Sequence, residues 1–212
     1  MAADRVEPFQ VALSNLRDRL REGVLAPGER IAAVDVAAAL RLSATPVREA
    51  LSRLAGEGLL EDRRGQGFFV RTLTAGDIAD LYRLSLAQLA IAHDPHRPAL
   101  GPAAPGARED PLPLTDPIRE VERLFADWVA ATGSRALSAA HRATQIQLGP
   151  VRRAEAGLLD DLAAEARELQ GLRLREPGGA WAVTVRRFHL RRISLADRLA
   201  ALLDRGRRAP EL

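Results

Sequence analysis

Residues 43–53 bring hydroxyl and guanidinium side chains together at the start of a helical pattern. Ser43 and Thr45 precede Pro46, and Arg48 and Arg53 follow on the side of the pattern that carries no apolar residues. A guanidinium can donate two parallel hydrogen bonds to guanine or to a phosphate, and a hydroxyl can bond to either. These residue types at this spacing predict contacts to DNA from one exposed helix face.

A second set of residues suited to nucleic acid follows shortly afterwards. Arg64, Gly65, Gln66 and Gly67 form a short basic turn before the apolar residues 68–70. Glycine permits backbone angles and a close approach to DNA that a side chain would prevent. The pattern predicts a β-hairpin whose tip contacts phosphates and the minor groove, next to a helix in the major groove.

Apolar residues at helical spacing must hold both sets in place. Residues 47–55 repeat such side chains, and we expect Thr45 to cap this helix. Two further amphipathic patterns, over 9–22 and 34–40, precede it. Three helices followed by a hairpin predict a winged helix-turn-helix domain over residues 1–73.

This stretch resembles the DNA-binding domain of the GntR family of bacterial transcription regulators. The resemblance is carried by TPVREAL at 45–51, GLL at 58–60, GQGFFV at 65–70 and the PG pair at 27–28. It implies a domain that binds operator DNA. The residues it assigns to DNA contact are Ser43, Thr45, Arg48, Arg53, Arg64, Gly65, Gln66 and Gly67.

The chain departs from the family pattern at two places where relatives carry arginines that contact DNA. Ala44 stands in the turn before the TPVREAL motif, and Ala33, Val34 and Asp35 open the second helix. A good bidentate base contact is worth about 1–3 kcal/mol of discrimination, so two missing contacts would weaken binding strongly. The alternative function is therefore a protein-interaction module that keeps the fold without specific DNA readout.

Residues 74–212 are predicted to form a second, all-α domain, because no alternating strand pattern follows Val70. A helix-start signal at 74–77 leads into an apolar pattern over 77–92. The stretch 94–116 is rich in proline and is interpreted as a linker or long loop. Further helices are expected over 117–132, 135–148, 151–171 and 180–205.

The start of this domain resembles the helical effector domain of the FadR subfamily, through DIADLY at 77–82. The resemblance implies a bundle that binds a small carboxylic acid and dimerises. Relatives that hold a metal use one aspartate and three histidines, but Ala126 stands where one of those histidines is expected, so we expect neither a metal nor a cofactor. The residues implied in effector binding are Glu122, Arg187, His189 and Arg191.

The other polar residues of this domain have interpretations that need no ligand. His93 and His96 are expected to be a solvated pair, and His141 a surface or partly buried residue. For His189, a satisfied core histidine or a hydrogen bond to a ligand is favoured over metal binding. The carboxylates at 160–161, 165 and 168 are expected to form a solvated helix face.

Composition narrows the class of protein. The chain has no cysteine, which excludes disulfides and thiolate metal sites, and no apolar run approaches the ~18 residues of a membrane span. All 31 basic residues are arginine, and against 28 acidic residues they leave a net charge of only +3. We expect a cytoplasmic regulator and not an enzyme: a homodimer that represses from a double-stranded DNA operator and responds to a small-molecule effector such as an organic acid.

Overall fold

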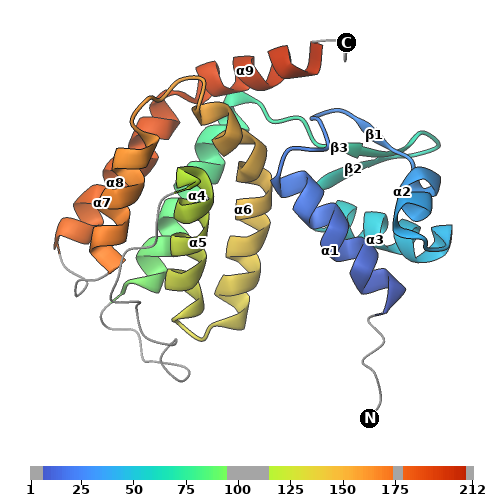
Figure 1. Cartoon of the computed structure of the whole chain (residues 1–212), viewed down its shortest axis with the longest axis horizontal. Coiled ribbons are helices and arrows are strands. Elements are labelled where there is room, and N and C mark those ends of the chain that lie inside the picture. The colour runs from blue at the N-terminus through green and yellow to red at the C-terminus, as the bar shows by residue number, and fades with distance from the viewer. Residues whose placement is uncertain (1–6, 95–114, 174–178, 209–212) are drawn as a thin grey trace.

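The computed structural model describes residues 7–94, 115–173 and 179–208. The predicted proline-rich loop at 94–116 lies, apart from its ends, outside these ranges, and so does His96. Figure 1 shows an N-terminal group of helices with a small sheet, beside a larger group of helices. We call residues 8–70 the N-terminal unit and residues 75–208 the helical unit.

The N-terminal unit has the predicted helices, with bounds Pro8–Arg21 (α1), Ala33–Leu40 (α2) and Ala44–Gly56 (α3). Its hairpin strands are Leu60–Arg63 (β2) and Gly67–Val70 (β3). A third strand, Arg30–Ile31 (β1), pairs antiparallel with β3, giving the sheet order β1-β3-β2. β1 was not predicted, because two residues are too few to show an alternating pattern and only pairing with β3 orders them.

The core of the N-terminal unit lies where α1 packs on α3. Leu16, Val47, Leu51 and Leu54 are fully buried there. Ile146, from the helical unit, belongs to the same apolar cluster. The helix with the predicted DNA-contacting residues is therefore fixed by packing of its apolar face, which leaves its polar face outside.

The start of α3 differs from the expectation. Ser43 is the N-cap residue, with extended backbone (φ −77°, ψ 160°), and Thr45 lies one residue inside the helix. The prediction that Thr45 caps the helix is wrong, because the helix begins two residues earlier than that cap requires, at Ala44. The Ser43 side chain makes no capping hydrogen bond either.

The helical unit is all-α over its described residues, so the predicted fold class is confirmed. The Thr74 side chain accepts a hydrogen bond from the Asp77 backbone N–H, and the Asp77 carboxylate accepts one from the Thr74 backbone N–H, which starts the first helix as predicted. The helices are Ala75–Ala92 (α4), Pro117–Ala130 (α5), Arg135–Glu155 (α6), Leu162–Arg173 (α7), Gly179–Ser194 (α8) and Ala196–Arg208 (α9).

Two predicted helix boundaries are wrong. We expected a break before Val151, but α6 continues through Pro150 to Glu155, and the break follows at residues 156–161. Leu148, Gly149 and Val151 are buried, so packing offsets the backbone hydrogen bond that proline removes. The predicted helix over 180–205 is divided at Leu195 into α8 and α9.

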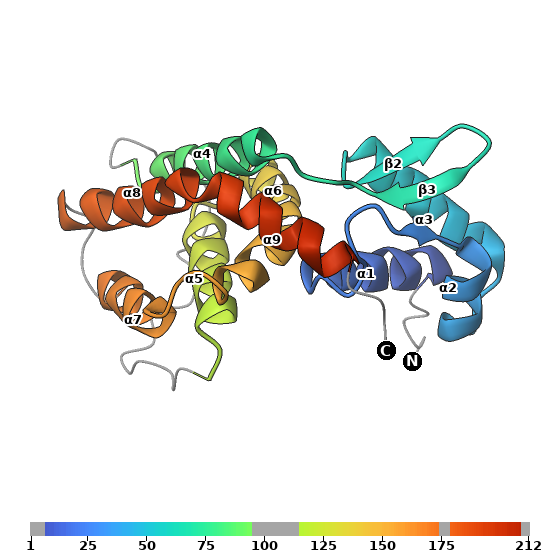
Figure 2. The ribbon, with the colours of Figure 1, turned by 90° about the horizontal axis from the view of Figure 1, so that it is seen from above.

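The two units meet along α1 and α6. A Cβ on Gly149 would lie 2.0 Å from the Arg21 carbonyl oxygen, so the helices touch backbone to backbone there. Glu22 accepts hydrogen bonds from Arg119 (2.9 Å) and Arg153 (3.1 Å) of the helical unit. Figure 2 shows α9 reaching across towards the N-terminal unit.

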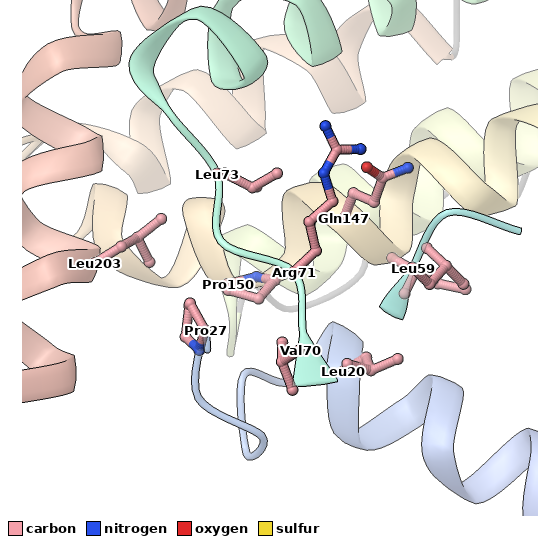
Figure 3. A pocket seen from close by; sticks show the side chains of 10 residues that line it. Leu20, Pro27, Leu59, Val70, Arg71, Leu73, Gln147, Pro150 and Leu203 are labelled. Atoms are coloured by element: carbon pink, nitrogen blue, oxygen red, sulfur yellow. The ribbon is translucent and has the colours of Figure 1, made fainter. Parts of the chain in front are cut away.

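A small apolar pocket lies beside this contact. Figure 3 shows Leu20, Val70, Leu73, Pro150 and Leu203 around it, drawn from both units. Its volume of about 30 Å³ suits one water molecule, so we interpret it as packing at the joint and not as a ligand site. None of the described helices is both long and apolar enough to cross a membrane.

Candidate nucleic-acid interface and interior polar site

Arg48 lies on the exposed face of α3, one turn after Ser43 and Thr45, which are also exposed. Its neighbour Val47 is fully buried, which orients the helix. No ion pair or hydrogen bond to Arg48 occurs within the described residues. Its guanidinium is therefore available to an external acceptor.

Arg53, further along α3, is exposed but already paired. Its Nε lies 2.8 Å from Oε1 of Glu57, and Arg17 of α1 donates to both oxygens of the same carboxylate, each at 2.8 Å. Burial raises the pKa of Glu57, but the hydrogen bonds from Arg17 and Arg53 outweigh it and hold that pKa below its usual value. An exposed pair of this kind is worth roughly 0–1 kcal/mol, so a phosphate can compete for Arg53.

The hairpin turn presents Arg64, Gly65 and Gln66 to solvent. Gly65 (φ +74°) and Gly67 (φ +99°) adopt backbone angles that favour glycine, as the sequence suggested. Arg64 has no partner among the described residues, whereas Arg63 pairs with Glu61 at 2.8 Å. Within the described part of the chain, the guanidinium of Arg64 is therefore available at the turn.

Arg30 was not among the predicted functional residues, yet it fixes the hairpin turn. Its Nε donates to the Gln66 carbonyl oxygen at 2.9 Å, across the β1–β3 pairing. Only the pairing of β1 brings residues this far apart in sequence together, so no local signal could have identified it.

The two departures from the family pattern lie near α3. Val34, in the first turn of α2, exposes 63% of its surface. Ala44 is the first residue of α3 and is half-buried. Apolar side chains therefore occupy two positions where arginines were expected.

His189 is a satisfied core histidine. It is fully buried, its Nδ1–H donates to the Val185 carbonyl oxygen at 2.7 Å, and its Nε2 then accepts from the Ser85 hydroxyl at 3.1 Å. Burial lowers the pKa of His189 to about 3. Both ring nitrogens are engaged, which leaves none for an effector.

The other predicted effector residues do not converge on one cavity. Arg187 pairs with Glu168, and Arg191 donates to Asp161 (2.7 Å) and Glu165 (2.8 Å). The expected solvated acidic face is thus partly wrong, because α8 supplies arginines to these carboxylates. Glu122 accepts from Arg153 at 3.2 Å.

An ion cluster lies inside the helical unit. Arg192 is 1% exposed and donates to Glu155 from Nε (3.0 Å) and Nη2 (2.8 Å), and to Glu165 at 2.7 Å. The Tyr82 hydroxyl donates to the other Glu155 oxygen. Burial alone would lower the pKa of Arg192, but the two carboxylates hold it above its ordinary value. This cluster ties α4, α6, α7 and α8 together.

The remaining histidines also differ from expectation. His141 is 2% exposed, and its ring bonds to Gln88 through Nδ1 at 3.1 Å, so the expected surface position is wrong. His93 is half-buried and stacks on Trp181, with ring centroids 4.0 Å apart, so it is not the solvated residue that we expected. Burial lowers the pKa of each to about 4. Three or more His, Asp or Glu side chains grouped as a metal site do not occur within the described residues.

A large cleft of about 780 Å³ separates part of the two units. Its walls are the α1 face from Gln10 to Glu22, the α5 face from Arg119 to Ala130 and the α6 face from Ser138 to Ile146. Among the predicted effector residues, only Glu122 lines it. The cleft was not foreseen, because its walls come from two units.

The N-terminal unit matches a known family. The sequence model for "Bacterial regulatory proteins, gntR family" matches residues 10–70. The chain is 53% identical over 58 residues to the "Nta operon transcriptional regulator" of Aminobacter aminovorans, covering 27% of this chain and 28% of that protein. It is 35% identical over 91 residues to the "Uncharacterized HTH-type transcriptional regulator YdhC" of Bacillus subtilis (strain 168), covering 42% and 41%.

These matches span less than half the length of those relatives. Solved structures extend the likeness to the whole fold. "E. coli McbR/YncC" aligns with a TM-score of 0.66 at 18% identity, covering 91% of this chain and 98% of that one. A "putative transcriptional regulator GntR from Rhodococcus sp. RHA1" aligns with a TM-score of 0.63 at 18% identity, covering 91% and 97%. Residues 10–70 of this chain therefore carry a domain that matches the gntR family of bacterial regulatory proteins.

Proposed function

We propose that this protein is a transcription regulator that binds double-stranded operator DNA through α3 and the β2–β3 hairpin. The observation that carries the proposal is the pair of exposed guanidinium groups on Arg48 and Arg64, which have no partner among the described residues and lie within the segment that matches the family. Ser43, Thr45, Arg53, Gly65, Gln66 and Gly67 complete the proposed contact surface. The proposal assigns no catalytic reaction to the chain.

A mobility-shift assay against the DNA upstream of the protein's own coding sequence, across a salt series, tests this function. Arg48→Ala should weaken binding by about 10-fold or more, since a good base contact is worth about 1–3 kcal/mol. Its thermal stability should stay that of the parent, because Arg48 is exposed and has no ion pair or hydrogen bond among the described residues. Arg83→Ala, on the exposed face of α4, is the matched control and should bind as the parent does. Equal binding by the Arg48 variant contradicts the assigned surface.

We propose further that the protein acts as a homodimer through the helical unit. Leu84 and Ile91 on α4, and Val183 and Leu190 on α8, are large apolar residues with 45–65% of their surface exposed. Each pair is one heptad apart, which places its members on one side of a helix. Sedimentation should show a dimeric parent and a monomeric Ile91→Glu variant. A monomeric parent contradicts this part of the proposal.

In this proposal the dimer represses from a chromosomal operator, which places it in the cytoplasm, and a small organic acid releases it. The support is the direct packing of α1, in the N-terminal unit, on α6, in the helical unit. Through this contact a structural change in one unit can reach the other unit. A reporter gene behind the operator should be less active with the protein present than without it.

A second candidate function keeps the fold but not the DNA readout. The observation that favours it is the 63% exposed Val34, an apolar residue at the start of α2. An exposed valine suits a protein partner as well as a thymine methyl group. The mobility-shift assay across a salt series distinguishes the two functions. If the protein never binds the upstream DNA more tightly than unrelated DNA, the second function is favoured.

A further inference from the structure

The α1 wall and the α6 wall of the cleft between the two units belong to helices that touch at one end. Figure 1 shows α1 and α6 close together at one end and diverging from there. The close end is the contact of Gly149 with the Arg21 backbone. A ligand bound in the cleft therefore lies between the N-terminal unit and the helical unit.

A chain of hydrogen bonds fixes the chemistry of one wall residue, His141. The Thr144 hydroxyl donates to the Ala140 carbonyl oxygen (3.1 Å), and Gln88 Nε2 donates to that hydroxyl (3.1 Å). The Gln88 carbonyl oxygen then accepts from His141 Nδ1 (3.1 Å). His141 Nδ1 must therefore carry the proton, and its Nε2 is a lone-pair acceptor with no partner among the described residues.

A second wall residue, Gln145, is held in the same way. Its Oε1 accepts from Nη1 of the buried Arg152, so its Nε2 is a donor, and no partner for it occurs among the described residues. Gln145 is 7% exposed and lies one helical turn after His141, on the same face of α6. A buried polar atom left without a hydrogen bond costs about 1–3 kcal/mol, so both atoms call for an external partner.

Most arginines at the cleft are already neutralised. Arg17 pairs with Glu57, Arg119 with Glu22, and Arg123 with Glu120. Arg142, exposed on α6, has no ion pair among the described residues. Over the residues that the structure describes, Arg142 is therefore a free cation at the cleft, and Ile146, Val129 and Ala126 add apolar surface.

We propose that this cleft binds a small hydroxycarboxylate, whose hydroxyl donates to His141 Nε2 and accepts from Gln145 Nε2 while its carboxylate pairs with Arg142. This site deepens the effector response of the proposed function, on which its regulatory role rests. Because α1 forms one wall, the ligand binds one arrangement of α1 against α6 best and shifts the protein towards it. By linkage, DNA affinity then changes with ligand concentration.

Isothermal titration calorimetry of the full chain with glycolate, L-lactate and L-malate tests the site. Each hydroxy acid has a partner acid that lacks only the hydroxyl: acetate, propionate and succinate, respectively. At least one hydroxy acid should bind, and at least about 10-fold more tightly than its partner, because the partner leaves His141 and Gln145 unsatisfied. Binding of none of the hydroxy acids, or equal binding of each pair, overturns the proposal.

Two substitutions locate the binding without touching the buried hydrogen bonds. Ala130→Trp places a bulky side chain on the exposed α5 wall of the cleft and should abolish binding. Ala139→Trp, exposed on α6 outside the cleft, is the matched control and should bind as the parent does. Circular dichroism verifies that both variants fold. Binding that survives in Ala130→Trp places the ligand elsewhere and overturns the proposal.

Fluorescence anisotropy with operator DNA separates this proposal from the function on which it rests. Addition of the hydroxy acid should change the DNA affinity of the parent and of Ala139→Trp, but not that of Ala130→Trp. DNA binding that no hydroxy acid changes overturns the regulatory role while leaving the DNA-binding function intact. Hydroxy acid binding that Ala130→Trp abolishes, in a chain that binds no DNA, supports the site and contradicts the proposed function.

Discussion

The two units of this protein bury different kinds of side chain. Every buried side chain of the N-terminal unit, among the described residues, is apolar. The helical unit buries Gln88, His141, Arg152, Glu155 and Arg192 among other polar residues. The charged side chains of the N-terminal unit thus lie at its surface, where DNA can reach them. In the helical unit, several charged side chains pair with one another in the interior.

The difference affects how each unit is held together. Apolar packing tolerates exchange of similar side chains, often at a cost below about 1.5 kcal/mol. A buried ion pair is sensitive to the loss of either partner, because the remaining charge has no water. We therefore expect the helical unit to respond sharply to single charge removals and to pH, and the N-terminal unit to respond little to either.

The largest effect should come from breaking the ion cluster. Arg192→Met leaves Glu155 and Glu165 without their buried partner and should lower the free energy of unfolding by about 3–5 kcal/mol. Urea unfolding followed by circular dichroism measures it. The control is Arg187→Met, on the same helix as Arg192. It breaks the exposed pair of Arg187 with Glu168 of α7 and should cost at most about 1 kcal/mol. Similar losses in both variants contradict the contrast between buried and exposed charge.

Acid should destabilise the helical unit as pH falls from about 6.5 towards 4, because its buried histidines resist protonation. Burial holds the pKa of His93 and of His141 at about 4 and that of His189 at about 3, below the unfolded value of about 6.5. As pH falls from about 6.5 towards 4, the unfolded chain takes up protons that the folded chain refuses. Each histidine then lowers the free energy of unfolding by up to about 1.4 kcal/mol per pH unit.

Urea unfolding at pH 7, 6 and 5 measures this slope. The N-terminal unit contains no histidine, so the slope reports on the helical unit. His93→Phe keeps a ring against Trp181 and should reduce the slope by about one histidine's share. A stability that does not change between pH 7 and 5 contradicts the neutral burial of these rings.

The contact between the units should be the next most sensitive place. Gly149→Ala sets a methyl group 2.0 Å from the Arg21 carbonyl oxygen, so α1 and α6 must separate. We expect a loss of about 1–3 kcal/mol, as for other overpacked sites. Gly171→Ala, where no atom lies within 4 Å of the new Cβ, is the control and should not destabilise. Thermal melts of both variants decide the matter, and equal melting temperatures contradict a close contact.

A smaller effect should appear at the hairpin turn. Arg64→Ala should weaken binding to all DNA sequences alike and reduce the slope of log K against log salt by about 0.9, the share of one phosphate. Anisotropy titrations at several salt concentrations measure the slope. A loss confined to one base position, with the slope unchanged, would make Arg64 a base-reading residue.

We expect no effect at all from chelators. The purified protein should carry no stoichiometric zinc, nickel or manganese, because first-row metal sites draw their affinity from several imidazoles, and both nitrogens of His189 are engaged. Elemental analysis of protein prepared without a chelator or a polyhistidine tag measures it. One tightly bound metal per chain would contradict the assignment.

Local patterns predicted the elements that local forces build. The apolar spacing around Leu51 and Leu54 predicted α3, and the glycines at 65 and 67 predicted the turn with positive φ. The capping pair Thr74 and Asp77 predicted the start of α4. In each case the residues that decide the structure are neighbours in sequence, so the sequence alone suffices.

Tertiary structure decided the burial and pairing of the polar residues. Gln88 meets His141 across 53 residues, and Ser85 meets His189 across 104. Packing against α1 keeps α6 helical through Pro150. Carboxylates of α7 pair with Arg187 and Arg191, which were predicted as effector contacts. A sequence shows which side chains can carry charge or donate a hydrogen bond. Whether such a side chain pairs with water, with a neighbouring helix or with a ligand depends on distances that only tertiary packing sets.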